Sequence, residues 1–366
     1  MPSDRRTFDR LRAQARQARE IGDYLQAARL EHQAAEWAGA LGFASSRARA
    51  LLWEGYSLRQ AGDDDLALAA LLQAAHNRAI AEPADVFSAL TAILHISLAR
   101  KPFQFCRTLL DQTRDWLFDL RQPWSAGLDF LEGELALRRG EFVDAWDWHS
   151  RAWAGWRDGH PCLTPATHLW ALCRTAFRRC DPAALAQWAG SLTKLPLVQP
   201  LERQLVQRAQ LLLWRTQRTA PAPVDPALDL LASTAHEARD SGACREVLQV
   251  LALADHWSAV DEILRQRSLT MDCFENRLLL GDLALNRLRI ALGLPVADDD
   301  YNEPVFGVRK PVIGQPVSPE MVDQVKLGYR AAQQLADGQD ARLETNWHGR
   351  SVHRRQRQLE SLVVNP

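Results

Sequence analysis

The sequence predicts an all-α protein with the architecture of an α-solenoid, in which about seventeen helices stack as antiparallel pairs. Three observations support this fold class. A length of 366 residues is long for one compact core but normal for a stack of repeats. Apolar residues recur at helical spacing, and no stretch alternates between apolar and polar residues for long. Small residues also recur about every forty residues, in a fixed relation to acidic ones.

The repeat is clearest where residues 51–75 are compared with residues 129–153. Each segment has a Gly, a second Gly seven residues later, an acidic residue directly after it, and an Ala five residues beyond the second Gly. These positions are Gly55, Gly62, Asp63 and Ala67 in the first copy, and Gly133, Gly140, Glu141 and Ala145 in the second. Weaker copies are formed by Ala15, Gly22, Asp23 and Ala27, and by Cys173, Cys180, Asp181 and Leu185. Turns between helices are therefore expected at residues 22, 62, 140 and 180, with a degenerate turn near residue 101.

Each position of the repeat has a physical role in a helix pair. The first small residue lets two helices cross closely. The second Gly ends the first helix in a left-handed conformation that other residues adopt only at a cost. The acidic residue favours the start of the second helix, whose N-terminus carries partial positive charge. The Ala lies where the second helix packs on the first.

This pattern resembles the tetratricopeptide repeat (TPR) family over at least residues 4–195, although the step of 39–40 residues exceeds the usual length of about 34. The resemblance implies a superhelix whose concave groove is lined by the first helix of each pair. The groove positions that the family uses for ligands hold eight arginines and three acidic residues in this chain. The candidate groove residues are Arg12, Arg16, Arg19, Arg49, Tyr56, Arg59, His95, Phe130, Arg138, Trp170, Arg174, Phe177 and Arg178.

The chemistry of these groove residues predicts a class of partner. Arginine forks bind carboxylates, and nearby rings bind apolar side chains. The predicted ligand is therefore an acidic peptide segment or a C-terminal carboxylate of a protein partner. The alternative is that the arginines form only a solvated face of an arginine-rich protein, because charged faces are usually just solvated.

The helical pattern continues beyond the clear repeats. Residues 1–292 are expected to form one helical solenoid with a proline-rich joint at residues 219–226. A short helix pair is expected to turn at Asp255–His256, and residues 271–292 are expected to form one long helix.

The last part of the chain departs from this pattern. Residues 293–318 are rich in proline and are expected to form a strap over the end of the solenoid or a lid on its groove. Residues 319–366 are expected to form a C-terminal cap with a basic tail. Within it, a helix pair is expected over residues 319–337 and 339–361.

Composition limits the classes of partner and compartment. The net charge of −1 gives no overall attraction to nucleic acid or to an anionic membrane. Arginine far outnumbers lysine, which suggests a GC-rich bacterial genome. None of the six cysteines has CxxC spacing, and neither a signal core nor an apolar run of about 18 residues occurs. These features predict a cytoplasmic protein with reduced, buried cysteines.

The chain contains no motif of a known catalytic or cofactor-binding site. Nucleotide-binding glycine loops, HExxH and GxSxG are all absent. Asp298, Asp300 and Asn302 imitate the first ligands of a calcium loop, but Glu303 replaces the required Gly and Arg309 the bidentate Glu. Four zinc-ligand types lie close together without a known ligand spacing: His149, His160, Cys162 and His168. We therefore expect neither catalysis nor a cofactor or metal.

Three functions remain in competition. The preferred one is a non-catalytic scaffold that binds a peptide or protein partner in its groove. A second is nucleic-acid binding through Arg12, Arg16, Arg19, Arg59 and the C-terminal arginines, although the neutral net charge and the lack of a reader motif disfavour it. A third is a small-molecule-sensing regulatory subunit with a pocket beneath residues 293–318. A shift in melting temperature across a metabolite panel would favour the third.

Overall fold

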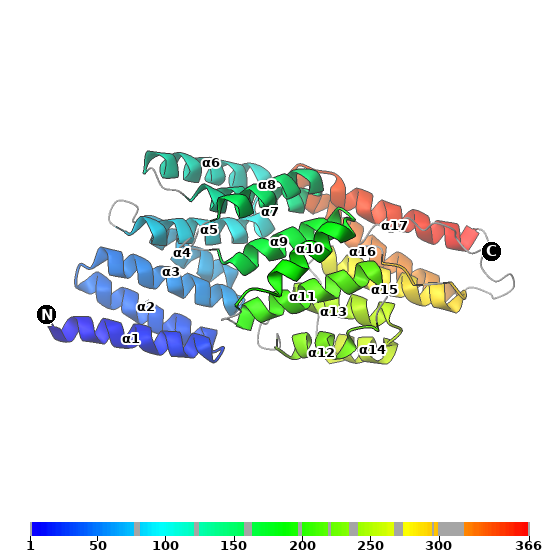
Figure 1. Ribbon diagram of the computed structural model, residues 1–366, viewed down its shortest axis with the longest axis horizontal. Helices are drawn as coiled ribbons and strands as arrows, with labels where there is room; N and C mark the ends of the chain where they lie inside the picture. The colour runs from blue at the N-terminus through cyan, green and yellow to red at the C-terminus, as the bar shows by residue number, and fades with distance from the viewer. Residues whose placement is uncertain are drawn as a thin grey trace. The chain divides into compact units, whose positions relative to one another are not determined.

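The computed structural model describes residues 2–76, 81–120, 124–156, 163–196, 200–218, 221–233, 241–266, 274–294, 296–298 and 318–364. These residues form seventeen α-helices and no β-strand, and consecutive helices pack on their neighbours (Figure 1). The predicted all-α, solenoid-like fold class and the predicted number of helices are therefore confirmed.

The described residues fall into two compact units, and α7 and α8 are each divided between them. Unit 1 contains residues 2–132 and 151–164, and unit 2 contains residues 133–150, 165–233 and 241–364. The helices are α1 (Pro2–Glu20), α2 (Tyr24–Ala40), α3 (Ala44–Gln60), α4 (Asp64–His76), α5 (Pro83–Arg100), α6 (Phe103–Asp119), α7 (Ser125–Arg139), α8 (Phe142–Gly155), α9 (Pro165–Arg178), α10 (Pro182–Leu192), α11 (Pro200–Gln217), α12 (Val224–Ser233), α13 (Ser241–Leu253), α14 (Trp257–Gln266), α15 (Phe274–Ala291), α16 (Pro319–Leu343) and α17 (Trp347–Val364).

The turns within the helix pairs lie where the sequence predicts them. Gly22, Gly62, Gly140 and Cys180 separate α1 from α2, α3 from α4, α7 from α8, and α9 from α10. Their φ angles are 81°, 86°, 78° and 57°, so all four have the left-handed conformation that the repeat requires. Asp255 has the same conformation, with φ 63°, at the predicted turn between α13 and α14.

The degenerate turn near residue 101 uses different chemistry. Helix α5 ends at Arg100 and α6 begins at Phe103. Lys101 has an extended backbone, with φ −107° and ψ 156°, and Pro102 then caps α6. A proline that stops one helix and precedes the next needs no left-handed residue, which explains why this copy has no glycine.

Three acidic residues after the turns cap the helices that follow. The side-chain oxygens of Asp23, Asp63 and Asp181 accept backbone N–H groups at 3.0, 3.1 and 3.0 Å. The predicted N-terminal role of these aspartates is confirmed. Glu141 differs, since its carboxylate accepts a hydrogen bond of 2.8 Å from Nε of Arg139.

The first glycine of each clear repeat copy lies at a close helix crossing. A Cβ atom at Gly55 would lie 2.5 Å from Cγ of Leu71 on α4. A Cβ atom at Gly133 would lie 2.2 Å from Cδ2 of His149 on α8. Both distances are shorter than real side-chain contacts, so only glycine permits these crossings.

The strained turn residue of the fourth repeat copy gives a stability prediction. Cys180→Gly should raise the free energy of unfolding by about 1 kcal/mol, because glycine adopts a positive φ without the strain that a Cβ atom causes. Urea unfolding followed by circular dichroism measures this change. Gly62→Ala should have the opposite sign and a similar size. A loss of stability in Cys180→Gly would show that the thiol contributes more than the strain costs.

The C-terminal helix pair is present, but its turn is displaced from the predicted position. Gly338 lies inside α16. The helix ends at Leu343, and its C-cap residue Glu344 has a φ of 53°. Asp340 then caps α17 by accepting the backbone N–H groups of His348 and Gly349 at 3.0 and 2.7 Å. Side-chain capping therefore decided this boundary, and the turn predicted at residue 338 is wrong.

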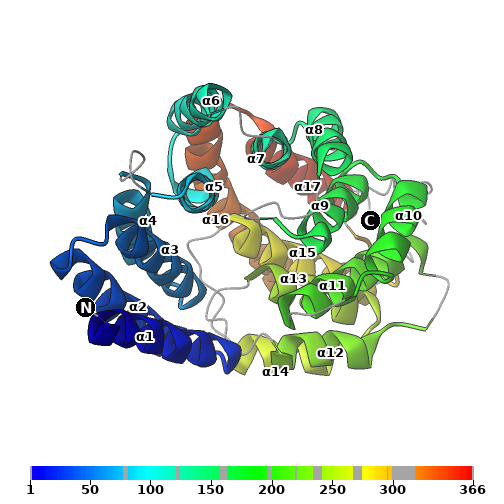
Figure 2. The ribbon, with the colours of Figure 1, turned by 60° about the vertical axis from the view of Figure 1, so that its left-hand side comes forward.

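Helices α15 and α16 cross at a pair of glycines in unit 2. Helix α15 packs against both α13 and α16, and α16 packs against α17 (Figure 2). A Cβ atom at Gly328 would lie 2.9 Å from Cα of Gly281. Beside this crossing, Tyr329 donates a hydrogen bond of 2.9 Å to Asp282, which also binds Arg355 at 2.7 Å. This buried network fixes the C-terminal pair to α15.

Only part of the proline-rich segment is described. Residues 296–298 are held by α11 and α15, since Asn286 exchanges two hydrogen bonds of 3.0 Å with the backbone of Ala297. The predicted strap or lid otherwise lies outside the described residues, as do residues 219–220 of the proline-rich joint.

Candidate binding site

The thirteen sequence-predicted groove residues all lie on α1, α3, α5, α7 and α9, which are the first helices of their pairs. They are divided between the two units. Unit 1 holds Arg12, Arg16, Arg19, Arg49, Tyr56, Arg59, His95 and Phe130, and unit 2 holds Arg138, Trp170, Arg174, Phe177 and Arg178.

Several of the predicted residues in unit 1 have partners within the fold. Arg12 and Arg19 both bind the fully buried carboxylate of Glu31 on α2, at 3.1 and 2.8 Å. Arg49 binds Asp85 on α5 at 2.8 Å, and Tyr56 donates a hydrogen bond of 3.2 Å to the Ser88 carbonyl. These contacts join neighbouring helices, so they stabilise the stack.

The remaining predicted residues of unit 1 differ in exposure. Phe130 is buried and its ring lies 5.8 Å from that of His95. Arg59 is half-buried, whereas Arg16 is exposed and has no ion-pair partner among the described residues.

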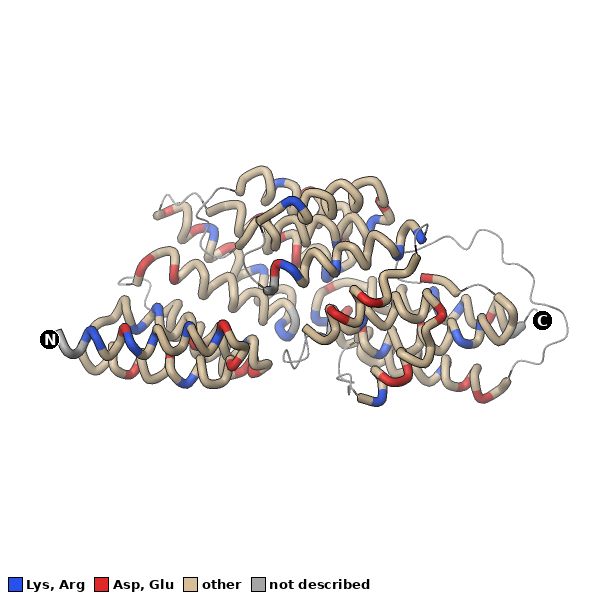
Figure 3. The backbone as a smooth tube through the Cα atoms, turned by 60° about the horizontal axis from the view of Figure 1, so that its bottom comes forward, with Lys and Arg blue, Asp and Glu red and all other residues tan. Residues whose placement is uncertain are grey.

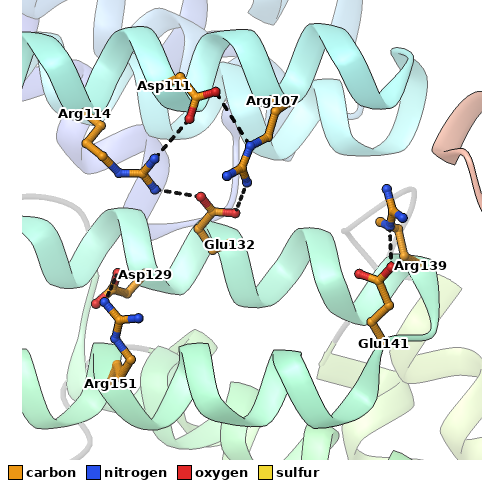
Figure 4. Close-up of polar contacts among 8 residues, drawn as sticks. All are labelled: Arg107, Asp111, Arg114, Asp129, Glu132, Arg139, Glu141 and Arg151. Atoms are coloured by element: carbon orange, nitrogen blue, oxygen red, sulfur yellow. Dashed lines mark hydrogen bonds and ion pairs between the residues drawn. The ribbon is translucent and has the colours of Figure 1, made fainter.

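Unit 1 also contains a polar cluster that sequence reasoning missed. The buried carboxylate of Glu132 on α7 binds Arg107 at 2.6 Å and Arg114 at 2.7 Å, and Asp111 lies between the two arginines (Figure 4). Burial raises the pKa of the neighbouring Asp129, which Arg151 opposes from 3.7 Å. The spacing of Arg107, Asp111 and Arg114 in the sequence indicates that they share one face of a helix, so the cluster could have been predicted. The cluster links α6 to α7 and is structural.

Four of the five predicted residues in unit 2 line one cavity of about 210 Å³. The fifth, Trp170, is not a lining residue. The walls come from α7, α9, α11 and α13, the first helices of successive pairs, and from α8, α15, α16 and α17. Six arginines line it: Arg138, Arg174, Arg178, Arg208, Arg215 and Arg245. Three glutamates also line it: Glu134, Glu246 and Glu275.

Positive charge is in excess around this cavity. Arg174 binds Glu134, Arg208 binds Glu246 through two hydrogen bonds of 2.8 and 3.0 Å, and Arg245 lies 3.9 Å from Glu275. Arg215 binds a fourth carboxylate, Asp298, through hydrogen bonds of 2.6 and 2.7 Å. Four of the six lining arginines are therefore each near a carboxylate. Arg138 has no ion-pair partner within the described part of the chain.

Two buried rings position the arginines of the cavity. The Arg208 guanidinium lies 4.7 Å from the centre of the Trp170 ring, and that of Arg215 lies 4.6 Å from the centre of Phe177. Trp170 is 6% exposed and Phe177 is 3% exposed. Trp170 therefore supports Arg208 through its ring face instead of offering that face to a ligand.

The C-terminal helix pair completes the wall of the cavity. Thr345, in the turn before α17, donates a hydrogen bond of 2.9 Å to the backbone carbonyl of Arg139. The Trp347 ring packs edge-on against Phe142 with 5.7 Å between ring centres, and it lies where a Cβ atom of Gly140 would be. The pair thus returns to the α7–α8 turn, at the start of unit 2.

Six contacts link successive helices around the cavity. They are Glu134–Arg174 (α7 to α9), Trp170–Arg208 (α9 to α11), Arg208–Glu246 (α11 to α13), Arg245–Glu275 (α13 to α15), Phe274–His348 (α15 to α17) and Thr345–Arg139 (the α16–α17 turn to α7).

His348 contributes a neutral imidazole to the cavity. The side chain is buried, and its Nδ1 lies 2.7 Å from Oδ1 of Asp340. Burial lowers the pKa of His348, and the hydrogen bond with Asp340 opposes this shift without cancelling it. The Asp340 carboxylate accepts a hydrogen bond from the Nδ1–H group, which leaves Nε2 with a lone pair.

One arrangement beside the cavity has the composition of a catalytic triad. Nδ1 of His149 lies 2.9 Å from Oγ1 of Thr175, and Nε2 lies 3.4 Å from Glu134. However, the Thr175 hydroxyl donates to the Ala171 carbonyl at 2.8 Å and is fully buried. A hydroxyl in this position cannot reach a substrate, so the arrangement joins α7, α8 and α9 structurally.

The candidate metal ligands are not brought together by the described structure. His160 and Cys162 lie outside the described residues, and His149 and His168 are both buried. No group of three or more metal-ligating side chains occurs among the described residues. Of the calcium-like series, Asp298 binds Arg215, and Asp300 and Asn302 lie outside the description.

No protein-family model matches this chain, and no curated protein is similar to it in sequence. The described helices include none that is both long and apolar enough to cross a membrane. Positive and negative residues are interspersed along the helices of each unit (Figure 3). Functional inference therefore rests on the cavity and its arginines.

Proposed function

We propose that this chain is a non-catalytic, TPR-like binding protein of the bacterial cytoplasm, whose unit 2 cavity takes a small organic anion with a carboxylate or phosphate group. The excess of guanidinium over carboxylate groups supports this function. The cavity, at about 210 Å³, is below the roughly 300–1,000 Å³ of pockets for drug-sized ligands, so it suits a small molecule.

The chemistry of the lining favours binding over catalysis. Planar guanidinium groups form paired hydrogen bonds with carboxylate or phosphate oxygens. Glu134 and Glu246 are each hydrogen-bonded to an arginine, which occupies oxygens that a general base would need for its substrate. These two glutamates therefore serve to hold the arginines in place, as expected for a sensing subunit that binds an anion.

The binding test uses the full chain and a panel of small acids that contains succinate, tricarballylate and propyl phosphate. At least one should raise the melting temperature and bind measurably by calorimetry. Arg138→Glu should weaken that binding at least tenfold, because it removes a charge-assisted hydrogen bond and adds repulsion. The matched control is Arg330→Glu, an exposed arginine on α16 that does not line the cavity, and it should leave affinity unchanged. Failure of every acid to bind would refute the proposal.

A peptide-binding scaffold is the second candidate, and one observation favours it. Arg16 and Arg49 occupy predicted groove positions in unit 1 and are exposed. A fluorescent glutamate-rich peptide should then bind the wild-type chain, and Arg16→Glu with Arg49→Glu should weaken its binding. Arg138→Glu should not affect it. Equal binding by all variants would reject the unit 1 groove.

A further inference from the structure

We infer that the anion held in the unit 2 cavity also carries a hydroxyl group, which donates a hydrogen bond to Nε2 of His348. The inference rests on the proposed function and names the ligand class of the same site as a small hydroxy acid or hydroxylated phosphate ester. It depends on one hydrogen-bond acceptor, Nε2 of His348, in a cavity lined by six arginines.

His348 is buried in the wall of the cavity and its ring is held in one orientation. The residue lines the cavity and is only 2% exposed, so its ring is almost completely removed from bulk water. Phe274 and Trp347 contact the ring edge-to-face, with 5.0 and 4.8 Å between ring centres. These contacts and the bond to Asp340 fix the ring orientation before any ligand arrives.

The tautomer of His348 determines which ring nitrogen can accept a hydrogen bond from a ligand. Asp340 binds Nδ1, so the proton of the neutral ring lies there and Nε2 can only accept a hydrogen bond. No described residue donates to Nε2. A ligand hydroxyl that enters the cavity can therefore donate to this acceptor.

The surrounding charge selects the kind of donor. A ligand ammonium group could also donate to Nε2, but six arginines line the same cavity and would repel it. A hydroxyl adds no charge. The proposed ligand thus places its acidic group on Arg138 and its neutral hydroxyl on His348.

The test compares acids that differ by one hydroxyl group: malate with succinate, citrate with tricarballylate, and glycerol 3-phosphate with propyl phosphate. In calorimetric titrations of the full chain, the hydroxylated member of at least one pair should bind about fivefold to tenfold more tightly, as one neutral hydrogen bond predicts. His348→Phe should abolish this preference, so that both members of the pair bind with equal affinity. His348→Gln, which keeps an acceptor, should restore part of it.

The outcomes separate the two proposals. If both members of every pair bind with equal affinity to the wild-type chain, the hydroxyl inference is overturned and the anion site stands. If no member of any pair binds, the proposed function itself fails. The wild-type comparison decides the question even if His348→Phe does not fold, and retained succinate or propyl phosphate binding shows that the variant cavity is intact.

Discussion

Gly328→Ala should lower the free energy of unfolding by about 3 kcal/mol, one of the two largest effects expected for a single substitution in this chain. The new Cβ atom would lie 2.9 Å from Cα and 3.0 Å from the backbone nitrogen of Gly281. Because these are backbone atoms, no side-chain rotation can relieve the overlap. Helices α15 and α16 must move apart, which opens the buried packing around Tyr329.

A second glycine in the same helix provides the control. A Cβ atom at Gly338 would have no heavy atom within 4 Å, apart from its chain neighbours and its own helix backbone. Gly338→Ala should therefore raise stability by about 1 kcal/mol, since alanine loses less conformational entropy on entering a helix. Urea unfolding of both variants, followed by near-ultraviolet circular dichroism, measures the difference. Equal effects in the two variants would show that α15 and α16 do not cross at these glycines.

Asp298→Ala should cost about 3–5 kcal/mol, because it leaves the Arg215 guanidinium buried without its counter-ion. The two side chains are only 1% and 2% exposed, and two hydrogen bonds join them. The substitution also removes the side chain that binds residues 296–298 to α11. Chemical unfolding and the melting temperature both report this loss.

A double-mutant cycle separates the ion pair from the burial of its charges. Arg215→Met with Asp298→Ala should cost less than the sum of the single substitutions, because the double variant buries no unpaired charge. Arg265→Ala provides the control, since its pair with Glu262 is exposed and should contribute less than about 1 kcal/mol. If Asp298→Ala cost no more than Arg265→Ala, the buried pair would not stabilise unit 2.

The candidate site was only partly predictable from the sequence. Arg138, Arg174, Phe177 and Arg178 line the cavity, and the repeat register placed them on the first helices of their pairs. The arginines of α11 and α13 were missed, because the repeat pattern was traced clearly only as far as residue 195. A signal existed in α11, where Arg208 and Arg215 are seven residues apart and so share one helix face.

Other parts of the site had no signal in the sequence. His348 lies in a segment that sequence reasoning treated as a basic cap. Its place in the cavity depends on the turn at Glu344 and on Asp340, which together set where α17 begins. The helix pair predicted over residues 319–337 and 339–361 placed the turn too early, because the pattern alone cannot show that residue 338 lies inside a helix.

The sequence by itself determined the helical fold class and the turns within the repeats. Those features depend on local chemistry, since a left-handed residue and an aspartate cap act within a few positions of one chain. Only the tertiary structure decided that the helices of unit 2 line one cavity. Beside it, Thr345 donates a hydrogen bond to the carbonyl of Arg139 across 206 positions of sequence, and no local pattern records a contact between such distant residues.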